Sequence, residues 1–159
     1  MENSKQHKVK IRKATTDDLE SICDIYTSAF KGITTPSSRQ WWNILEDKNI
    51  HYYVAEVGGF VVGVASLITI NKLIRGGNRI GLIEDVGVSK TSGSRGVGTM
   101  LIEKLKDLAI ERGCYKVILN CSEDNIGFYK KCDFYQNEVQ MRWDRPIQLG
   151  PKARNKGLF

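Results

Sequence analysis

No part of the 159-residue chain is apolar for long enough to span a bilayer, which needs about 20 consecutive apolar residues. The segment 1–13 is polar and basic without a hydrophobic run, so it does not resemble a secretory signal. We therefore expect a soluble, cytoplasmic protein. The apolar share of 41% and the charged share of 26% are ordinary for a globular domain and exclude disordered, collagen-like and coiled-coil chains.

The sequence also lacks cysteine and histidine residues at the spacing that a metal site needs. Four cysteines are present, but none forms a C-x-x-C pair, and both histidines, His7 and His51, lie far from them in the sequence. We therefore predict no zinc site and no metal. A catalytic cysteine would need a histidine base beside it, and no such pairing is recognisable. We expect the cysteines to be reduced thiols that fill the core.

The central part of the chain has no stripe of interleaved basic and aromatic residues, although the net charge is +6. Residues 1–13 and 142–159 each hold five basic residues against one acidic residue, so the positive charge is concentrated at the two ends. This distribution favours solvated termini over a nucleic-acid surface. We predict no nucleic-acid partner, and a basic tail over 146–159 that is mobile or docked on a partner chain.

Hydrophobic periodicity predicts one α/β (mixed α+β) domain over 1–145, with a mixed sheet and helices packed on its faces. Strands are predicted at 8–13, 51–57, 60–70, 80–88, 115–120 and 134–143, and helices at 17–30, 37–47, 97–112 and 124–132. Gly58-Gly59 joins two of the strands as a hairpin. The run 115–120 is typical of a buried, continuously apolar strand.

The glycine-rich loop 89–98 connects a predicted strand to a predicted helix, and it reads G-S-R-G-V-G over 93–98. Glycine lets the backbone approach a ligand, and the free N–H groups at a helix start attract phosphate oxygens. Arg95 adds a charged donor. The loop is not a dinucleotide G-x-G-x-x-G motif and lacks the G-K-[ST] of a Walker loop. On these features alone, a glycine loop without any ligand remains equally possible.

This strand, loop and helix, placed after a three-strand meander, resemble the acyl-CoA loop R/Q-x-x-G-x-G/A of the GNAT N-acetyltransferase superfamily. The segments 72–77 (KLIRGG), 83–88 (IEDVGV), 113–134 (GCYKVILNCSEDNIGFYKKCDF) and 139–142 (VQMR) are similar to the eukaryotic glucosamine 6-phosphate N-acetyltransferase family. The resemblance covers about residues 8–143 and is strongest from residue 72 onward.

That resemblance implies the GNAT acyl-CoA N-acyltransferase fold, a mixed central β-sheet with helices on both faces. It also implies direct transfer of the acetyl group of acetyl-CoA to the 2-amino group of D-glucosamine 6-phosphate, without a covalent enzyme intermediate. The product would serve amino-sugar (UDP-GlcNAc) biosynthesis, and the enzyme would be a homodimer without a metal.

The resemblance implies catalytic roles for Glu84, Asp85, Tyr129 and Asn120. It implies acetyl-CoA binding by Val86, Gly87, Val88, Ser94, Arg95, Gly96, Val97, Gly98, Thr99 and Asn125. It implies sugar-phosphate binding by Lys72, Leu73, Ile74, Arg75, Glu84, Asp85, Tyr115, Lys116 and Arg142, the last of these across a dimer interface. The carboxylates would receive the amine proton, the Val86 N–H would stabilise the oxyanion, and Tyr129 would stabilise or protonate the leaving thiolate.

The chain departs from the family pattern at four positions. Gly93 replaces the leading Arg or Gln of the loop, Asn120 replaces an acid, Gly87 replaces a β-branched residue, and Asp133 replaces a glycine. Two alternatives therefore stay open at this stage. One is an acetyltransferase for a different amine, such as a protein amine, because fold alone does not fix the substrate. The other is an acyl-CoA-binding sensor without turnover.

Overall fold

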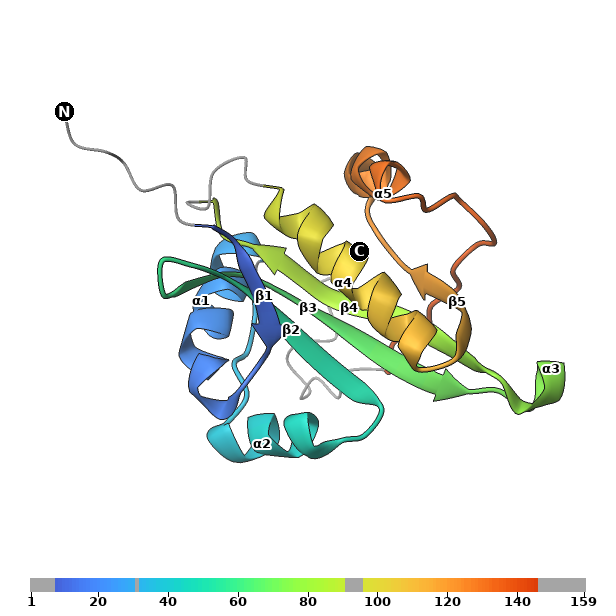
Figure 1. Ribbon diagram of the computed structural model, residues 1–159, viewed down its shortest axis with the longest axis horizontal. Helices are drawn as coiled ribbons and strands as arrows, with labels where there is room; N and C mark the ends of the chain where they lie inside the picture. Colours follow the sequence, from blue (N-terminus) through green and yellow to red (C-terminus); the bar gives the residue numbers. More distant parts are fainter. Residues whose placement is uncertain (1–7, 31, 91–95, 146–159) are drawn as a thin grey trace, which may run out of the picture.

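A five-stranded sheet runs through the computed structural model, which describes residues 8–30, 32–90 and 96–145 (Figure 1). The strands are β1 (Lys10–Lys13), β2 (Ile50–Val57), β3 (Phe60–Asn71), β4 (Arg79–Val88) and β5 (Cys114–Leu119). They follow one another across the sheet in sequence order. Neighbours are antiparallel, except that β4 and β5 are parallel. The predicted mixed sheet and its meander are confirmed.

The helices are α1 (Leu19–Ala29), α2 (Ser38–Glu46), the single turn α3 (Ile74–Gly77), α4 (Val97–Glu111) and α5 (Ile126–Lys131). Short 3₁₀ turns at Thr16–Asp18 and Glu123–Asn125 precede α1 and α5, so both predicted helices start with a tighter turn. Within the described ranges, no helix has both the length and the apolar character that crossing a membrane would require.

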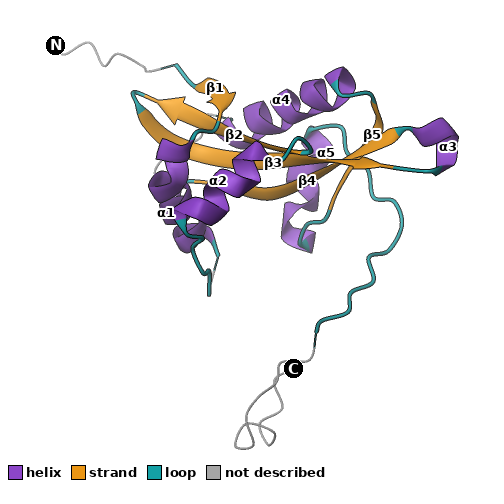
Figure 2. Ribbon diagram, turned by 90° about the horizontal axis from the view of Figure 1, so that it is seen from below, coloured by secondary structure: helices purple, strands orange, loops and turns teal. Residues whose placement is uncertain are grey.

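Helices cover both faces of the sheet (Figure 2). On one face, α4 buries Leu101, Ile102 and Leu105 against Ala65 and Leu67 of β3 and Ile83 of β4. On the other face, α1 and α2 bury Ile22, Ile25 and Trp41 against Val54 of β2 and Val64 of β3. Successive residues of a strand point to opposite faces, so β3 supplies both layers of core.

The start of α2 is fixed by its own sequence. The backbone N–H of Gln40 donates to the Ser37 hydroxyl at 3.3 Å, and the Ser37 N–H donates to the Gln40 side-chain carbonyl at 2.8 Å. This capping box satisfies two backbone donors that a helix start leaves unpaired. It places Trp41 in the first turn, where the ring is buried and its Nε1 donates to the Thr15 carbonyl at 3.0 Å.

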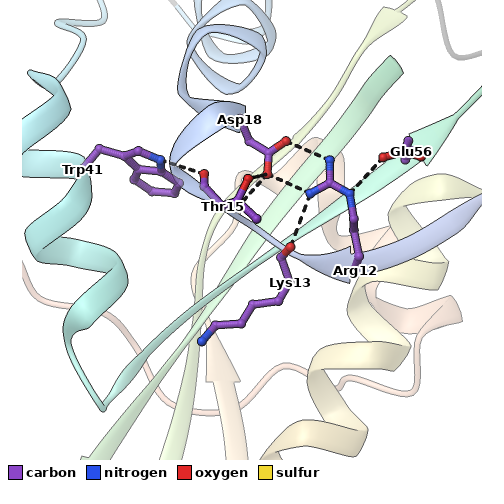
Figure 3. A network of polar contacts seen from close by, with 6 residues as sticks. All are labelled: Arg12, Lys13, Thr15, Asp18, Trp41 and Glu56. Atoms are coloured by element: carbon purple, nitrogen blue, oxygen red, sulfur yellow. Dashed lines mark hydrogen bonds and ion pairs between the residues drawn. The ribbon is translucent and has the colours of Figure 1, made fainter. Parts of the chain in front are cut away.

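One arginine ties β1 to the elements on either side of it (Figure 3). The Arg12 guanidinium donates two hydrogen bonds of 2.8 Å to Asp18, before α1, and one of 2.9 Å to Glu56 on β2. The Arg12 side chain lowers the pKa of Asp18, and a hydrogen bond from the Thr15 backbone lowers it further. Because Asp18 is almost fully buried, its charge depends on this pairing.

Two expectations for the C-terminal part are wrong. The strand β5 is not buried: it lies at the edge of the sheet, and Tyr115, Lys116 and Ile118 are exposed. Residues 134–145 form no strand and run away from the sheet as a loop (Figure 2). A strand needs a neighbour for its backbone hydrogen bonds, and this segment finds none within the described chain.

The cysteines fill the core less completely than predicted. All four are free thiols; Cys132 is buried, Cys23 and Cys114 are half-buried, and Cys121 is exposed. No cluster of metal-binding side chains occurs in the part of the chain that the structure describes.

Asp133 ends α5 in the left-handed conformation, with φ of 65°. The Phe134 N–H donates to the Tyr129 carbonyl at 3.1 Å and the Asp133 N–H to the Lys130 carbonyl at 3.2 Å, which is a Schellman motif. The conformation suits the glycine that the family resemblance implies at this position, since glycine adopts it without a Cβ penalty. An exposed contact of 3.4 Å with Lys106 offsets little of that penalty.

We predict that Asp18→Asn lowers the free energy of unfolding by about 2 kcal/mol at neutral pH, because Arg12 loses its main charged partner. The folded pKa of Asp18 is lowered, so its contribution is complete above the unfolded pKa and is lost as pH falls below about 4. Urea unfolding of both proteins as a function of pH measures this. A difference that stays constant down to acid pH contradicts the assignment.

Candidate active site

The strands β4 and β5 separate halfway along β4. Their pairing runs from Arg79 opposite Cys114 to Ile83 opposite Leu119. From there β4 continues to Val88, paired with β3 on one edge and with no described strand on the other (Figure 1). No strand of the described chain pairs with this edge of Glu84–Val88. Its backbone N–H and C=O groups are therefore available to a ligand that lies between the two diverging strands. The predicted residues Glu84 to Val88 all lie on this open part.

A β-bulge lies at the same place. Val64 of β3 faces Gly87 and Ser66 faces Glu84, so Asp85 and Val86 together occupy the space opposite one residue. Asp85 has φ of 54°, in the left-handed region that non-glycine residues rarely adopt. Such backbone strain is concentrated at functional sites. The bulge lets two successive acids contribute to one region of the sheet.

Two tyrosines and a serine that the sequence analysis did not select hold the bulge. The Tyr26 hydroxyl of α1 donates to the Asp85 carbonyl at 2.6 Å, and the Tyr52 hydroxyl of β2 donates to Asp85 Oδ2. The Ser66 hydroxyl donates to the Glu84 carbonyl at 3.0 Å. Only the pairing register, which places Tyr52 opposite Ser66 and Ser66 opposite Glu84, could have revealed this row.

Two ionisable groups near the bulge, Glu84 and Tyr129, have raised pKa values. Burial raises the pKa of Glu84, and the negative charge of Asp85 raises it further. Burial also raises the pKa of Tyr129 on α5, and nearby Cys121 and Glu84 raise it further. Glu84 is therefore a stronger proton acceptor than an ordinary surface carboxylate, and Tyr129 remains a phenol at neutral pH.

The start of α4 faces the open edge of β4. Gly96 precedes the helix with φ of 67°, and a Cβ added there would meet nothing within 4 Å, which leaves room for a ligand. The 15-residue helix presents its first N–H groups and the positive end of its dipole at this point. This cradle fits the pyrophosphate of an acyl-CoA. The predicted loop residues Ser94 and Arg95, and Gly93 before them, lie outside the described residues.

The other residues predicted to bind acetyl-CoA differ in their surroundings. Val97 is buried, so it anchors the helix in the core, and the Thr99 hydroxyl interacts with the thiol of Cys132. Gly98 is packed closely against α5: a Cβ there would lie 3.1 Å from the ring of Phe128. This contact fixes the helix that carries Tyr129 beside the start of α4. Asn125 is exposed and bonds Ser122 at 3.2 Å.

The predicted phosphate-binding residues gather at the opposite end of β4. The Arg75 guanidinium lies 5.5 Å and Lys116 Nζ 5.8 Å from the centre of the Tyr115 ring. Leu73 and Ile74 are exposed beside them, and the Lys72 N–H closes the turn by bonding the Asn78 carbonyl at 2.9 Å. We call Arg75, Tyr115 and Lys116 the cationic cluster.

The cationic cluster and Asp85 do not meet within one chain. Tyr115 and Lys116 lie between the pairs Arg79–Cys114 and Gly81–Val117, so they are beside a part of β4 that is four to six positions from Asp85. At about 3.3 Å per residue this is about 13–20 Å along the strand. Arg142 lies in the loop after α5, where it bonds Asp144 at 2.9 Å and contacts neither group. Asn120 is exposed after β5 and makes no hydrogen bond within the described residues.

Comparison with known proteins identifies the fold family. The profile described as "Acetyltransferase (GNAT) family" matches residues 19–134. The chain belongs to the GNAT acetyltransferase family. The glucosamine 6-phosphate N-acetyltransferase of Candida albicans is 37% identical over 100 residues, 63% of this chain and 67% of that protein. The enzyme of the same name from Trypanosoma brucei brucei is 45% identical over 86 residues, 54% and 58% of the two chains.

A solved structure extends the similarity over nearly the whole chain. The glucosamine-6-phosphate N-acetyltransferase of Arabidopsis thaliana superposes with a TM-score of 0.77 at 29% identity, covering 86% of this chain and 98% of that one. This GNAT domain therefore has the fold that the sequence predicted, a mixed sheet with helices on both faces.

The packing of α1 on β4 explains why glycine fits at position 87 of this GNAT protein. A Cβ at this position would lie 3.0 Å from Ile25 Cγ2 and 3.2 Å from the ring of Tyr26, so α1 packs directly on the backbone of β4. The ring of Tyr26 occupies the space that a β-branched side chain would need. Gly87 and Tyr26 thus form a matched pair, and the pair carries the hydrogen bond from Tyr26 to Asp85.

We predict that Gly87→Val lowers the free energy of unfolding by about 1–3 kcal/mol through overpacking against Tyr26. Adding Tyr26→Ala should reduce that cost, because the ring that the valine meets is gone. Gly127→Val is the control, since a Cβ at Gly127 meets nothing within 4 Å. Denaturant unfolding measures this for five proteins: the wild type, Gly87→Val, Tyr26→Ala, the double variant and Gly127→Val. Equal costs of Gly87→Val with and without the Tyr26 ring refute the pairing.

Proposed function

We propose that this acetyltransferase moves the acetyl group of acetyl-CoA to the 2-amino group of D-glucosamine 6-phosphate, giving N-acetyl-D-glucosamine 6-phosphate and CoA. The observation that carries the proposal is the acidic bulge of Glu84 and Asp85 on the open edge of β4. The names and identities of the relatives from Candida albicans and Trypanosoma brucei brucei support the amino-sugar substrate.

In the proposed reaction the neutral amine attacks the thioester carbonyl directly. Glu84 takes up the amine proton, which its raised pKa supports, and Asp85 orients the amine. The Val86 N–H donates to the oxyanion of the tetrahedral intermediate, an interaction of this kind being worth about 3 kcal/mol. The C–S bond then breaks, and Tyr129 stabilises or protonates the CoA thiolate. Its raised pKa keeps Tyr129 a neutral phenol, which supports a hydrogen bond from its hydroxyl to the developing thiolate.

Asn120 serves as a hydrogen-bond partner in this scheme and not as a base. An amide cannot accept the ammonium proton, but Glu84, Asp85 and Tyr129 are all retained in this chain. Acetyl-CoA binds along Val86–Val88, with its pyrophosphate at the N-terminus of α4.

The proposed enzyme is a homodimer in which each site uses both chains. The cationic cluster lies about 13–20 Å along β4 from Asp85 of the same chain, which favours a second copy as the source of phosphate ligands near Asp85. A second copy can supply the missing phosphate ligands. The loop after α5 supports this assembly: Val139, Met141 and Trp143 alternate along it and are 80–89% exposed, while the edge of β5 is unpaired in the described chain.

An acceptor panel tests the activity. We predict CoA release from acetyl-CoA with glucosamine 6-phosphate, and at least about tenfold lower kcat/KM with unphosphorylated glucosamine or a lysine peptide, because both lack the phosphate. Tyr129→Phe is the control, because it should keep acetyl-CoA affinity and lose turnover. Preference for the peptide would identify a protein acetyltransferase, and acetyl-CoA binding without any turnover would identify a sensor. Either result contradicts the proposal.

A mixing experiment tests the shared site. Asp85→Asn and Arg75→Ala each remove one half of every site in a dimer, so each variant alone should retain only a small residual activity. A mixed dimer contains one site with intact Asp85 from one chain and intact Arg75 from the other. We predict that mixing the two variants and exchanging their subunits restores activity. Each mixed dimer should approach half the activity of a wild-type dimer. Mixed dimers that form and remain inactive would contradict the arrangement, as would a wild-type monomer by light scattering at micromolar concentration.

A further inference from the structure

Asp85 receives hydrogen bonds from two phenols that come from different elements, a helix and a strand. Tyr26 on α1 binds its backbone carbonyl, and Tyr52 on β2 binds Oδ2 of its side chain. The second carboxylate oxygen, Oδ1, accepts no hydrogen bond from the described residues. The Asp85 side chain is exposed, so Oδ1 is open to a bound substrate while Oδ2 is held.

Tyr52 is itself fixed by its surroundings. Its ring meets Trp41 of α2 edge-on, with centroids 5.1 Å apart and an interplanar angle of 78°. Trp41 is buried and bonds the Thr15 carbonyl at 3.0 Å, so it is a rigid support. Burial, followed by the hydrogen bond to Asp85, raises the pKa of Tyr52, and the phenol therefore stays a donor over the whole physiological range.

Tyr26 fixes the backbone that carries the carboxylate. Its hydroxyl bonds the carbonyl of the one residue of β4 that is in the left-handed conformation, and its ring fills the space over Gly87. Together the two phenols fix both the backbone and the side chain of Asp85. A hydrogen bond from a neutral donor to a carboxylate is stronger than one between neutral groups, and it restricts the rotation of the carboxylate.

We infer that Tyr52 is a positioning residue, which holds Asp85 Oδ2 so that Oδ1 is directed at the amino group of the acceptor. This inference rests on the proposed function for the identity of the acceptor. It assigns a role in acceptor alignment to β2 and α2, elements that the family motifs of this chain do not include. Alignment of a reacting amine by a fixed group lowers the entropic part of the barrier.

Tyr52→Phe tests the inference, because it removes the hydroxyl and keeps the ring on Trp41. We expect kcat/KM for glucosamine 6-phosphate to fall between about tenfold and a hundredfold, with unchanged affinity for acetyl-CoA. Tyr53→Phe is the matched control: the next residue of β2 faces α4, where Lys104 Nζ lies 5.5 Å from its ring. Tyr53→Phe should leave kcat/KM within about twofold of wild type.

A double-mutant cycle separates positioning from general stability. If Tyr52 acts through Asp85, Tyr52→Phe should have little further effect in the Asp85→Asn background. Additive losses would overturn the inference, because they would mean that the phenol acts on something else. So would wild-type kcat/KM in Tyr52→Phe.

The contact can also be measured without substrate. The carboxyl carbon resonance of Asp85, assigned by its loss in Asp85→Asn, should shift in Tyr52→Phe and stay unchanged in Tyr53→Phe. An unshifted resonance overturns the positioning role. If the resonance shifts but the wild-type enzyme does not acetylate glucosamine 6-phosphate, the proposed substrate fails and the cycle is run with the amine that the acceptor panel identifies.

Discussion

The left-handed backbone of Asp85 occurs where β4 leaves β5, and most of the candidate site depends on that conformation. It places Asp85 and Val86 opposite one residue of β3, which breaks the regular alternation of side chains along β4. An L-residue pays about 1–2 kcal/mol to adopt this conformation. The surrounding structure offsets that cost through hydrogen bonds from Tyr26 and Tyr52. Elements on one face of the sheet thus stabilise the strained conformation of Asp85. In the described chain, the edge of β4 beside it stays unpaired, where the ends of β4 and β5 diverge.

The two layers of helices have different tasks. On one face, α1 brings Tyr26 to the bulge, and Trp41 of α2 packs against Tyr52 of β2. These helices are anchored near β1 through the Arg12–Asp18 contact and the hydrogen bond from Trp41 to the Thr15 carbonyl. On the other face, α4 presents its N-terminus beside the open edge, and its close packing with α5 holds Tyr129 nearby. In the proposed reaction, the acceptor is therefore aligned mainly from one layer and the acetyl donor from the other. Their meeting point is the unpaired part of β4.

The sequence predicted those parts of the fold that depend on local pattern. The hairpin at Gly58-Gly59, the meander and the amphipathic α4 are confirmed, because periodicity and turn chemistry are local properties. The prediction of a strand at 134–143 is wrong. Alternating apolar residues favour a strand, but they do not provide a neighbouring strand to pair with. The exposure of β5 follows from the same missing neighbour.

The candidate site was predicted only in part, for a similar reason. Glu84 and Asp85 stand out because acids interrupt an apolar strand, and the resemblance to a known family supplied Tyr129. Tyr26 and Tyr52 carry no such signal, since their roles follow from a bulge and a pairing register that only the folded chain defines. Gly87, where the family resemblance implies a β-branched residue, likewise becomes meaningful only once Tyr26 is seen to occupy the same space.

The most direct test of this account is a crystal structure of the protein with CoA and N-acetyl-D-glucosamine 6-phosphate. We predict the acetamido group at the open edge of β4, with its nitrogen near Asp85 Oδ1 and its carbonyl oxygen facing the Val86 N–H. The phosphate should contact Arg75 and Lys116 of the partner subunit. A sugar bound away from β4, or a phosphate bound entirely by the chain that supplies Asp85, would contradict the account.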